Sequence, residues 1–393
     1  MDFSYICSEC GRGFDIEPQL MVCPECGLTQ ASDQPLRGVL EVEVRGEVPA
    51  DWEIASLLPV ERQYFPSIPV GGTPLWAPRR LRGELDYPGL YIKDDGLNPT
   101  CSLKDRASFL VSAFAAKFGI REIILASTGN AGSSMAGVGA AAGQKVTLFL
   151  PKAAPKAKLI QALQYGARVF RVDGSYDDAY DLSLAYTARF GGLSRNTAYN
   201  PMTIEGKKTV SLEVFRQLGR VPDYVFVSVG DGCILSGVYK GFRDLCRLRL
   251  ADRIPVVYAV QAEGSAALAR AFETGTFRRE ATSTVADSIS VDVPRNGFHA
   301  LRQLKAHSGQ VVRVSDEKIL AAQARLSRSA GLFTEPAGAA AFAGFLEAQR
   351  RLPADALAVV LATGNGLKDT AAAGRSVTIP EKVITSLDEV EGS

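Results

Sequence analysis

The segment NPTCSLKDRASFL, residues 98–110, places a single lysine, Lys104, where a polar turn passes into an apolar, alanine-bearing segment. Most lysines are solvated surface residues, because an ammonium group is costly to bury. At this junction the lysine is expected in the first turn of a helix, where parallel α/β folds often place functional groups. Lysine amines that act in covalent catalysis do so by forming a Schiff base with a carbonyl carbon. The elements around residue 104 decide between these two roles.

Strands and helices alternate regularly after Lys104, and apolar periodicity predicts them in two successive runs. The first run has helices over 105–118, 130–142, 154–165 and 176–190, and strands over 121–127, 145–150 and 167–172. The second has strands over 223–230, 255–263 and 357–364, and helices over 235–246 and 265–275. Residues 35–95 read as irregular apart from a short strand at 89–95, and a polar tail follows about residue 376. These runs predict an α/β fold with two open, twisted parallel sheets.

The overall composition is that of an ordinary globular protein. The 393 residues are 46% hydrophobic and 22% charged, enough apolar material for two domains or one large domain with an appendage. Lys plus Arg total 44 and Asp plus Glu 43, so net charge gives no attraction to nucleic acid. The N-terminus MDFSYICSEC lacks a signal-peptide pattern, and no run reaches the roughly 18 apolar residues of a membrane span. We expect a cytoplasmic protein without nucleic-acid or membrane partners.

Four of the seven cysteines form two short knuckles near the N-terminus. CSEC contains Cys7 and Cys10, and CPEC contains Cys23 and Cys26. Two such knuckles supply the four thiolates of a tetrahedral zinc site, and with every ligand from the protein the role would be structural. Disulfides are the alternative, which a reducing cytosol disfavours.

Four strand-to-helix turns are rich in small residues, at 126–134, 228–237, 334–340 and 361–369. In parallel α/β folds such turns face a crevice at the carboxyl ends of the strands. Gly230 and Gly232 follow an apolar strand and open a helix, so their amides can hold a phosphate. Tight helix–sheet packing is the structural alternative. Asp231 would repel a phosphate unless its side chain turns away to cap the helix.

Two other turns offer polar groups to a small ligand. The amide of Asn130 can meet a phenolic or carbonyl oxygen, and Ser127, Thr128 and the amides after Gly129 can bind a carboxylate. Thr363 ends a buried strand with its hydroxyl free. Each feature is common in βα turns when taken alone. Combined with a phosphate cradle and Lys104, they favour pyridoxal phosphate, which binds a lysine covalently and provides an electron sink that side chains lack.

These residues resemble those of the fold-type II pyridoxal-phosphate enzymes. NPTCSLKDRAS is similar to their NPTGSFKDRG lysine motif, STGNAG to their SSGN loop, and VGDGCILSGVYKGF to their glycine-rich phosphate loop. ATGNGLKD is similar to the TGHGLKD segment of threonine synthases, one branch of which carries a Cys-rich N-terminal knuckle. The resemblance covers about residues 70–375, with the four motifs in the same order.

The resemblance implies a role for each matching position. Lys104 would hold the cofactor covalently and act on the α-proton of the substrate, Asn130 would hydrogen-bond the pyridine 3′ oxygen, and Thr363 would face the pyridine nitrogen. The cofactor phosphate would lie against Gly230, Asp231, Gly232, Cys233 and Ile234. The substrate would contact Ser127, Thr128, Gly129, Asn130, Ala131 and Asn200.

The resemblance also implies a domain arrangement. A zinc-ribbon-like module would occupy residues 1–34, with Cys7, Cys10, Cys23 and Cys26 as its metal ligands. The larger cofactor-binding domain would comprise 35–104 and 201–393, and the smaller α/β domain 105–200, which contributes the substrate-side loop. A homodimer is expected.

The activity implied is that of a threonine synthase, which converts O-phospho-L-homoserine and water to L-threonine and phosphate. The family often has an arginine for the substrate phosphate where this chain has Thr203, and Lys207, Lys208 or Asn200 would have to compensate. Because TVADSISVDVPRN resembles a dehydratase segment, a threonine or serine dehydratase is an alternative. So is a cysteate synthase-like β-replacement enzyme acting on O-phosphoserine. A non-enzymatic scaffold is a third, and neither His299 nor His307 is expected to be catalytic.

Overall fold

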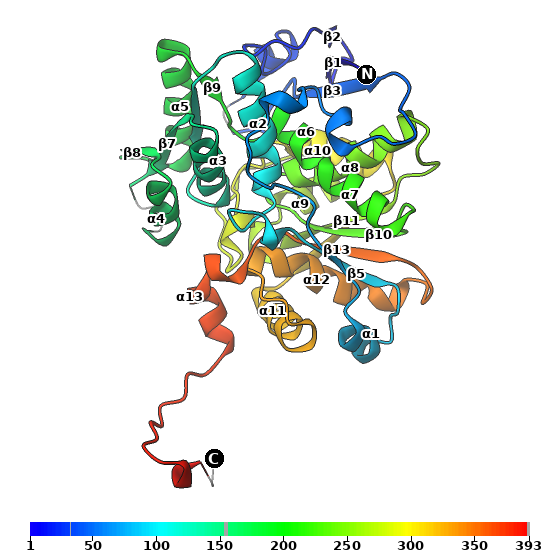
Figure 1. Cartoon of the computed structure of the whole chain (residues 1–393), viewed down its shortest axis with the longest axis vertical. Helices are drawn as coiled ribbons and strands as arrows, with labels where there is room; N and C mark the ends of the chain where they lie inside the picture. The colour runs from blue at the N-terminus through cyan, green and yellow to red at the C-terminus, as the bar shows by residue number, and fades with distance from the viewer. Residues whose placement is uncertain (32, 153–155, 391–393) are drawn as a thin grey trace.

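The computed structural model describes residues 1–31, 33–152 and 156–390. Two parallel sheets form the body of the molecule, and a small N-terminal sheet lies at one end (Figure 1). The larger sheet has the order β12-β11-β10-β13-β5-β4, and only the β4–β5 pair is antiparallel. Its strands are β4 (Leu75–Trp76), β5 (Leu90–Asp94), β10 (Tyr224–Ser228), β11 (Val256–Ala262), β12 (Gln310–Val314) and β13 (Ala358–Ala362).

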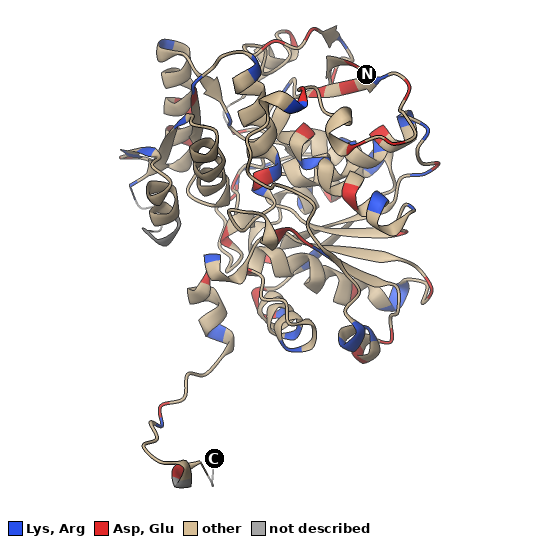
Figure 2. Ribbon diagram, in the orientation of Figure 1, with Lys and Arg blue, Asp and Glu red and all other residues tan. Residues whose placement is uncertain are grey.

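The central strands β10 and β13 are uncharged, as Figure 2 shows, and are buried along almost their whole length. Successive side chains point to opposite faces of a strand. Phe226 therefore packs on the face covered by α12 (Pro336–Ala348), while Val225 and Val227 face the side covered by α8 (Cys233–Arg247). Burial on both faces explains why these strands read as continuous apolar runs in the sequence.

The smaller sheet has four parallel strands in the order β8-β7-β6-β9. They are β6 (Glu122–Ala126), β7 (Lys145–Pro151), β8 (Arg168–Val172) and β9 (Leu193–Ser194). One face packs on α2 (Lys104–Lys117) and α3 (Asn130–Ala141), the other on α5 (Tyr176–Phe190). The remaining helix of this part is α4 (Lys156–Gln164), and the first two residues of the predicted 154–165 helix lie outside the described residues.

The predicted fold class is confirmed: two parallel-sheet layers lie side by side, preceded by a cysteine-bearing module. The strands of the smaller sheet lie within residues 105–200, and those of the larger sheet lie on either side of that segment. We propose that residues 105–200 form the smaller domain and that residues 35–104 and 201–393 form the larger one. The N-terminal sheet has the order β2-β1-β3, with β1 (Asp2–Cys7), β2 (Gly13–Phe14) and β3 (Leu40–Arg45). This sheet thus continues past residue 34, because β3 pairs with β1 along its full length.

Several elements differ from the sequence prediction. The strand predicted at 89–95 is β5, but the rest of residues 35–95, predicted to be irregular, contains β3 and α1 (Arg79–Leu85), and β12 is not predicted. The other helices are α6 (Met202–Lys207), α7 (Thr209–Leu218), α9 (Ala267–Thr274), α10 (Gly297–Ala306), α11 (Asp316–Ala330) and α13 (Thr370–Ala373). After α13 the chain runs away from the body (Figure 1). In the part that the structure describes, no helix has the length and apolar character needed to cross a membrane.

Candidate active site

A cavity of about 310 Å³ lies where the carboxyl ends of the two sheets meet the start of α2. Turns and loops that follow strands of both sheets contribute to it, as expected for a ligand crevice in a parallel α/β fold. Its lining includes Lys104, Ala126, Ser127, Thr128, Gly129, Asn130, Ala131, Ser175, Tyr176, Asp177, Tyr180, Thr197, Asp231, Arg279, Asp287, Ser288, Ser290, Val291, Asp292, Val293 and Arg295. Sequence motifs far apart in the chain thus meet at one site.

Lys104 is the first residue of α2, and its side chain lines the cavity. Burial lowers the pKa of its amine, which raises the fraction of neutral, nucleophilic amine at neutral pH. The turn before it is fixed from both sides: the Asp105 carboxylate accepts from the Thr100 amide at 2.7 Å, and the Leu103 amide donates to the Thr363 carbonyl at 2.9 Å. This second bond places Thr363, at the end of β13, beside the lysine turn.

Cys101 adopts φ +69°, the left-handed conformation that favours glycine. This position is the one where the resembling lysine motif has glycine. A left-handed non-glycine residue costs roughly 1–2 kcal/mol, so the turn before Lys104 keeps its shape against local backbone strain. The bonds made by Asp105 and Leu103 hold it there.

The loop before α3 presents Ser127 to Ala131 to the cavity. The Ser127 hydroxyl accepts from the Gly132 amide at 2.9 Å, which tightens the loop. Asn130 donates through Nδ2 to Glu335 Oε1 at 2.7 Å, while its Oδ1 is buried and has no hydrogen-bond partner among the described residues. Glu335 precedes α12 in the TEPAGAA turn, whose small residues predict a place at the crevice but no role for this carboxylate.

The turn Gly230–Ile234 joins β10 to α8. Gly232 has φ +88°, a left-handed conformation that favours glycine, and a Cβ on Gly230 would lie 2.9 Å from the Cα of Ile289, so each position favours glycine for its own reason. Asp231 does not cap α8, whose N-cap residue is Gly232; its Oδ1 accepts from the Cys233 amide at 2.8 Å and so occupies one of the amides that a phosphate could bind. Of the five residues in the turn, only Asp231 is among those lining the cavity.

The segment expected to bind the substrate phosphate does not reach the cavity. Asn200 is fully buried, donating to the Ser194 carbonyl at 2.7 Å and accepting from the Met202 amide at 2.9 Å. The Thr203 hydroxyl donates to the Asn200 carbonyl at 2.7 Å. Lys208 is buried against Asp244 at 2.8 Å. All of these polar groups are satisfied inside the fold.

Sequence motifs missed a cluster at the cavity wall. Asp177, from α5, forms an ion pair with Arg295 and lies 3.4 Å from Arg279, so it joins the smaller-sheet part to the larger one. The Arg295 guanidinium also lies over the Tyr180 ring, 4.8 Å from its centre. The neighbouring Tyr176, whose side chain is 42% exposed, also lines the cavity, and its hydroxyl donates to the Ala126 carbonyl at 3.3 Å. These residues lie in segments that are far apart in the chain and that contain no recognisable motif, so the sequence alone does not predict that they meet.

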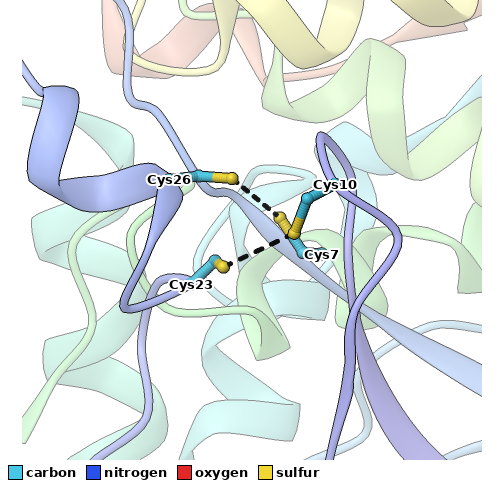
Figure 3. A group of neighbouring side chains, drawn as sticks. All are labelled: Cys7, Cys10, Cys23 and Cys26. Carbon is cyan, nitrogen blue, oxygen red and sulfur yellow. Dashed lines mark hydrogen bonds between the residues drawn. The ribbon is translucent and has the colours of Figure 1, made fainter.

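The four N-terminal cysteines converge at a second site (Figure 3). Their sulfur atoms all lie within 4.8 Å of one another, and the Cys7–Cys26 and Cys10–Cys23 sulfur pairs are each 3.8 Å apart. A tetrahedron with metal–sulfur bonds of about 2.3 Å has sulfur–sulfur edges of about 3.8 Å. The cluster therefore has the size of a zinc–thiolate site.

Residues 67–364 match the profile of a family described as "Pyridoxal-phosphate dependent enzyme". The chain belongs to this family. It is 35% identical over 372 residues to a threonine synthase of Methanosarcina acetivorans, covering 92% of this chain and 91% of that protein. A threonine synthase of Methanocaldococcus jannaschii is 33% identical over 389 residues, with 96% of each chain covered. The chain is thus a threonine synthase-like, pyridoxal-phosphate-dependent lyase of fold type II.

Solved structures agree on the fold. Maize serine racemase gives a TM-score of 0.67 at 20% identity, covering 76% of this chain and 89% of that one. Threonine deaminase isoform 2 of Solanum lycopersicum gives 0.67 at 21% identity, covering 78% and 87%. At these identities the likeness concerns the arrangement of the chain and not the substrate.

The cavity fits the family's cofactor on three observations. The Lys104 amine lines it with a lowered pKa, the buried Asn130 Oδ1 has no protein hydrogen-bond partner among the described residues, and the Gly230 backbone is packed too closely for any side chain. A pyridine ring that carries an aldehyde, a phenolic oxygen and a phosphate ester needs an amine, a hydrogen-bonding side chain and a closely approaching backbone turn. Lys104, Asn130, Thr363 and the Gly230–Ile234 turn could hold it.

Proposed function

We propose that the protein converts O-phospho-L-homoserine and water to L-threonine and phosphate. The observation that carries this proposal is the likeness to threonine synthases over more than nine-tenths of the chain, together with an intact lysine site. Pyridoxal phosphate, when bound, provides the electron sink that stabilises negative charge at the substrate α-carbon.

The protein's own residues would do the remaining work. Lys104 Nζ would bind the cofactor and then take and return a proton, which its lowered pKa favours. The amides and hydroxyls of 127–131 would orient the substrate carboxylate at the start of α3. Thr363, a neutral hydroxyl, would leave the pyridine nitrogen unprotonated, which favours elimination and replacement over transamination.

A dehydratase or β-replacement activity is the second candidate, and the structure gives a specific reason for it. Thr203 stands where an arginine is expected, and neither Asn200, Lys207 nor Lys208 lines the cavity. The arginines that do line it are Arg279 and Arg295, which share the Asp177 carboxylate. A phosphorylated substrate would therefore have to use these two arginines.

A substrate panel separates the candidates. We expect inorganic phosphate and threonine in equal amounts from O-phosphohomoserine, measured by a phosphate assay and chromatography. Threonine, serine and O-phosphoserine with a thiol or sulfite serve as competing substrates. Production of 2-oxobutyrate or pyruvate alone, from unphosphorylated threonine or serine, would show that the synthase proposal is wrong and the dehydratase correct.

We also propose that the four cysteines bind one structural zinc ion. Elemental analysis of protein purified without added metal is expected to give about one zinc per chain, and Cys23→Ser to give almost none, because four thiolates complete the tetrahedral shell. Cys246→Ser, outside the cluster, is the control and should keep the metal. A zinc-free native protein in which none of the four thiols reacts with a thiol reagent would instead indicate disulfides.

A further inference from the structure

Lys207 differs from the other fully buried lysines outside the cavity. Each of those has a carboxylate partner: Lys93 has Glu213 at 2.6 Å, Lys208 has Asp244 at 2.8 Å and Lys240 has Glu205 at 3.4 Å. The Lys207 side chain is equally buried, yet its ammonium donates to Cys233 Sγ at 3.0 Å, and no carboxylate of the described residues lies within 4.0 Å. Sulfur is a weak acceptor, so this charge is poorly compensated by the protein.

Arg195 shows the same imbalance next to the same residue. Its guanidinium is fully buried, and among the described residues it bonds only the hydroxyls of Ser108, at 3.3 Å, and Thr197, at 3.0 Å. Burial lowers its pKa, and the largest opposing effects come from the neighbouring residues Cys233 and Asp231. Two buried cations without a carboxylate partner among the described residues thus lie around the first turn of α8.

The position of Cys233 identifies what these cations face. Cys233 opens the 15-residue helix α8, directly after the Gly230–Gly232 turn. Asp231 adds a carboxylate to that turn and uses the Cys233 amide for itself. The turn therefore offers a phosphate one N–H fewer and one negative charge more than an uncharged glycine turn would. Extra positive charge is needed at this end of the site for a dianion to bind.

We propose that Lys207 is a cofactor-binding residue: its ammonium is the counter-ion of the cofactor phosphate at the Gly230–Ile234 turn, with Arg195 as a second, more distant charge. The inference rests on the proposed binding of pyridoxal phosphate and adds to it a charged partner beneath the turn. Lys207 is not among the residues that line the cavity and instead contacts Cys233 within the turn itself. Buried charges in proteins are paired, and a phosphate monoester at neutral pH provides that pairing.

The test compares two aldehydes that differ only in the phosphate. Apoprotein is titrated with pyridoxal phosphate and, separately, with pyridoxal, and the dissociation constants are read from absorbance. For Lys207→Met we expect the affinity for pyridoxal phosphate to fall by about 10- to 100-fold, the range for one charge-assisted contact. The affinity for pyridoxal should change by less than about threefold, because the lost contact involves only the phosphate. Lys318→Met, at an exposed ion pair, is the control and should change neither constant.

Equal losses for both aldehydes, or no loss for either, would overturn the inference and leave Lys207 with a packing role. Thermal unfolding of the wild-type and Lys207→Met apoproteins shows whether a loss of affinity is caused by a folding defect. Should Lys207→Met fail to fold, phosphorus NMR of the wild-type holoprotein decides: a contacting ammonium keeps the phosphate dianionic well below its usual second pKa of about 6, whereas a titration midpoint near 6 contradicts the contact. Wild-type protein that binds neither aldehyde would refute the cofactor itself, which is a separate failure.

Discussion

Replacing Lys104 by alanine should lower turnover by about 10³-fold or more, because this change removes both the covalent attachment of the cofactor and the amine that moves the α-proton. The visible absorption of the bound cofactor should disappear, and borohydride should no longer fix the cofactor to the chain. Turnover is measured with the best substrate of the panel. The absorption spectrum and the mass of the borohydride-treated protein give two readouts that do not depend on the substrate.

The fold should survive this change. Lys104 is at the first position of α2 and makes no ion pair with the described residues, so a smaller side chain leaves no buried charge behind. Lys117→Ala, at the other end of the same helix and paired with Glu61 at the surface, is the matched control and should keep full activity. A Lys104→Ala protein that keeps its colour and its turnover would remove Lys104 from the chemistry.

Much of the fold could be predicted because its central strands are buried on both faces. Strands such as β10 and β13 read as short apolar runs, and the turns after them carry Gly230 and Thr363. Likewise, the spacing of the N-terminal cysteines fixes which thiols can meet. These features depend on a few neighbouring residues, so local sequence carries them.

The rest of the site depends on contacts between distant segments. Asp177, Arg279 and Arg295 meet only because α5 of one part lies against the loops of the other. Asn200 looked suited to a ligand, but its amide bonds Ser194 and Met202 within the fold. Whether a polar side chain faces a cavity or completes the backbone's hydrogen bonding is decided by tertiary structure, which no local motif encodes.

Arg106→Met should be the most destabilising single change in the body of the protein, lowering the free energy of unfolding by about 3–5 kcal/mol. The Arg106 side chain is fully buried and forms two-pronged pairs with Asp95, at 2.6 and 2.8 Å, and with Glu213, at 2.6 and 2.8 Å. These contacts link the lysine helix α2 to η4 (Asp95–Leu97) and to α7. Removing the guanidinium leaves two buried carboxylates, with Lys93 paired to only one of them.

Urea unfolding at neutral pH measures this change. Arg62→Met is the matched control, because Arg62 pairs with Glu53 at 3.1 Å while both side chains are mostly exposed. Exposed ion pairs contribute about 0–1 kcal/mol, so the control should hardly shift the unfolding midpoint. Similar losses for both variants would contradict the view that burial makes the Arg106 network costly to break.

The pH dependence of the free energy of unfolding provides a second, independent test of the Arg106 prediction. Burial alone would raise the Glu213 pKa, but the charges and hydrogen bonds of Arg106 and Lys93 lower it to about 2. A carboxylate with a lowered folded pKa stabilises the protein above its unfolded pKa of about 4.3, and this contribution is lost as the pH falls from there toward 2. Without Arg106 the folded pKa of Glu213 rises, so less of this stabilisation exists at neutral pH. The stability difference between wild type and Arg106→Met should therefore shrink as the pH falls below about 4, and a difference that grows in acid would contradict the assignment.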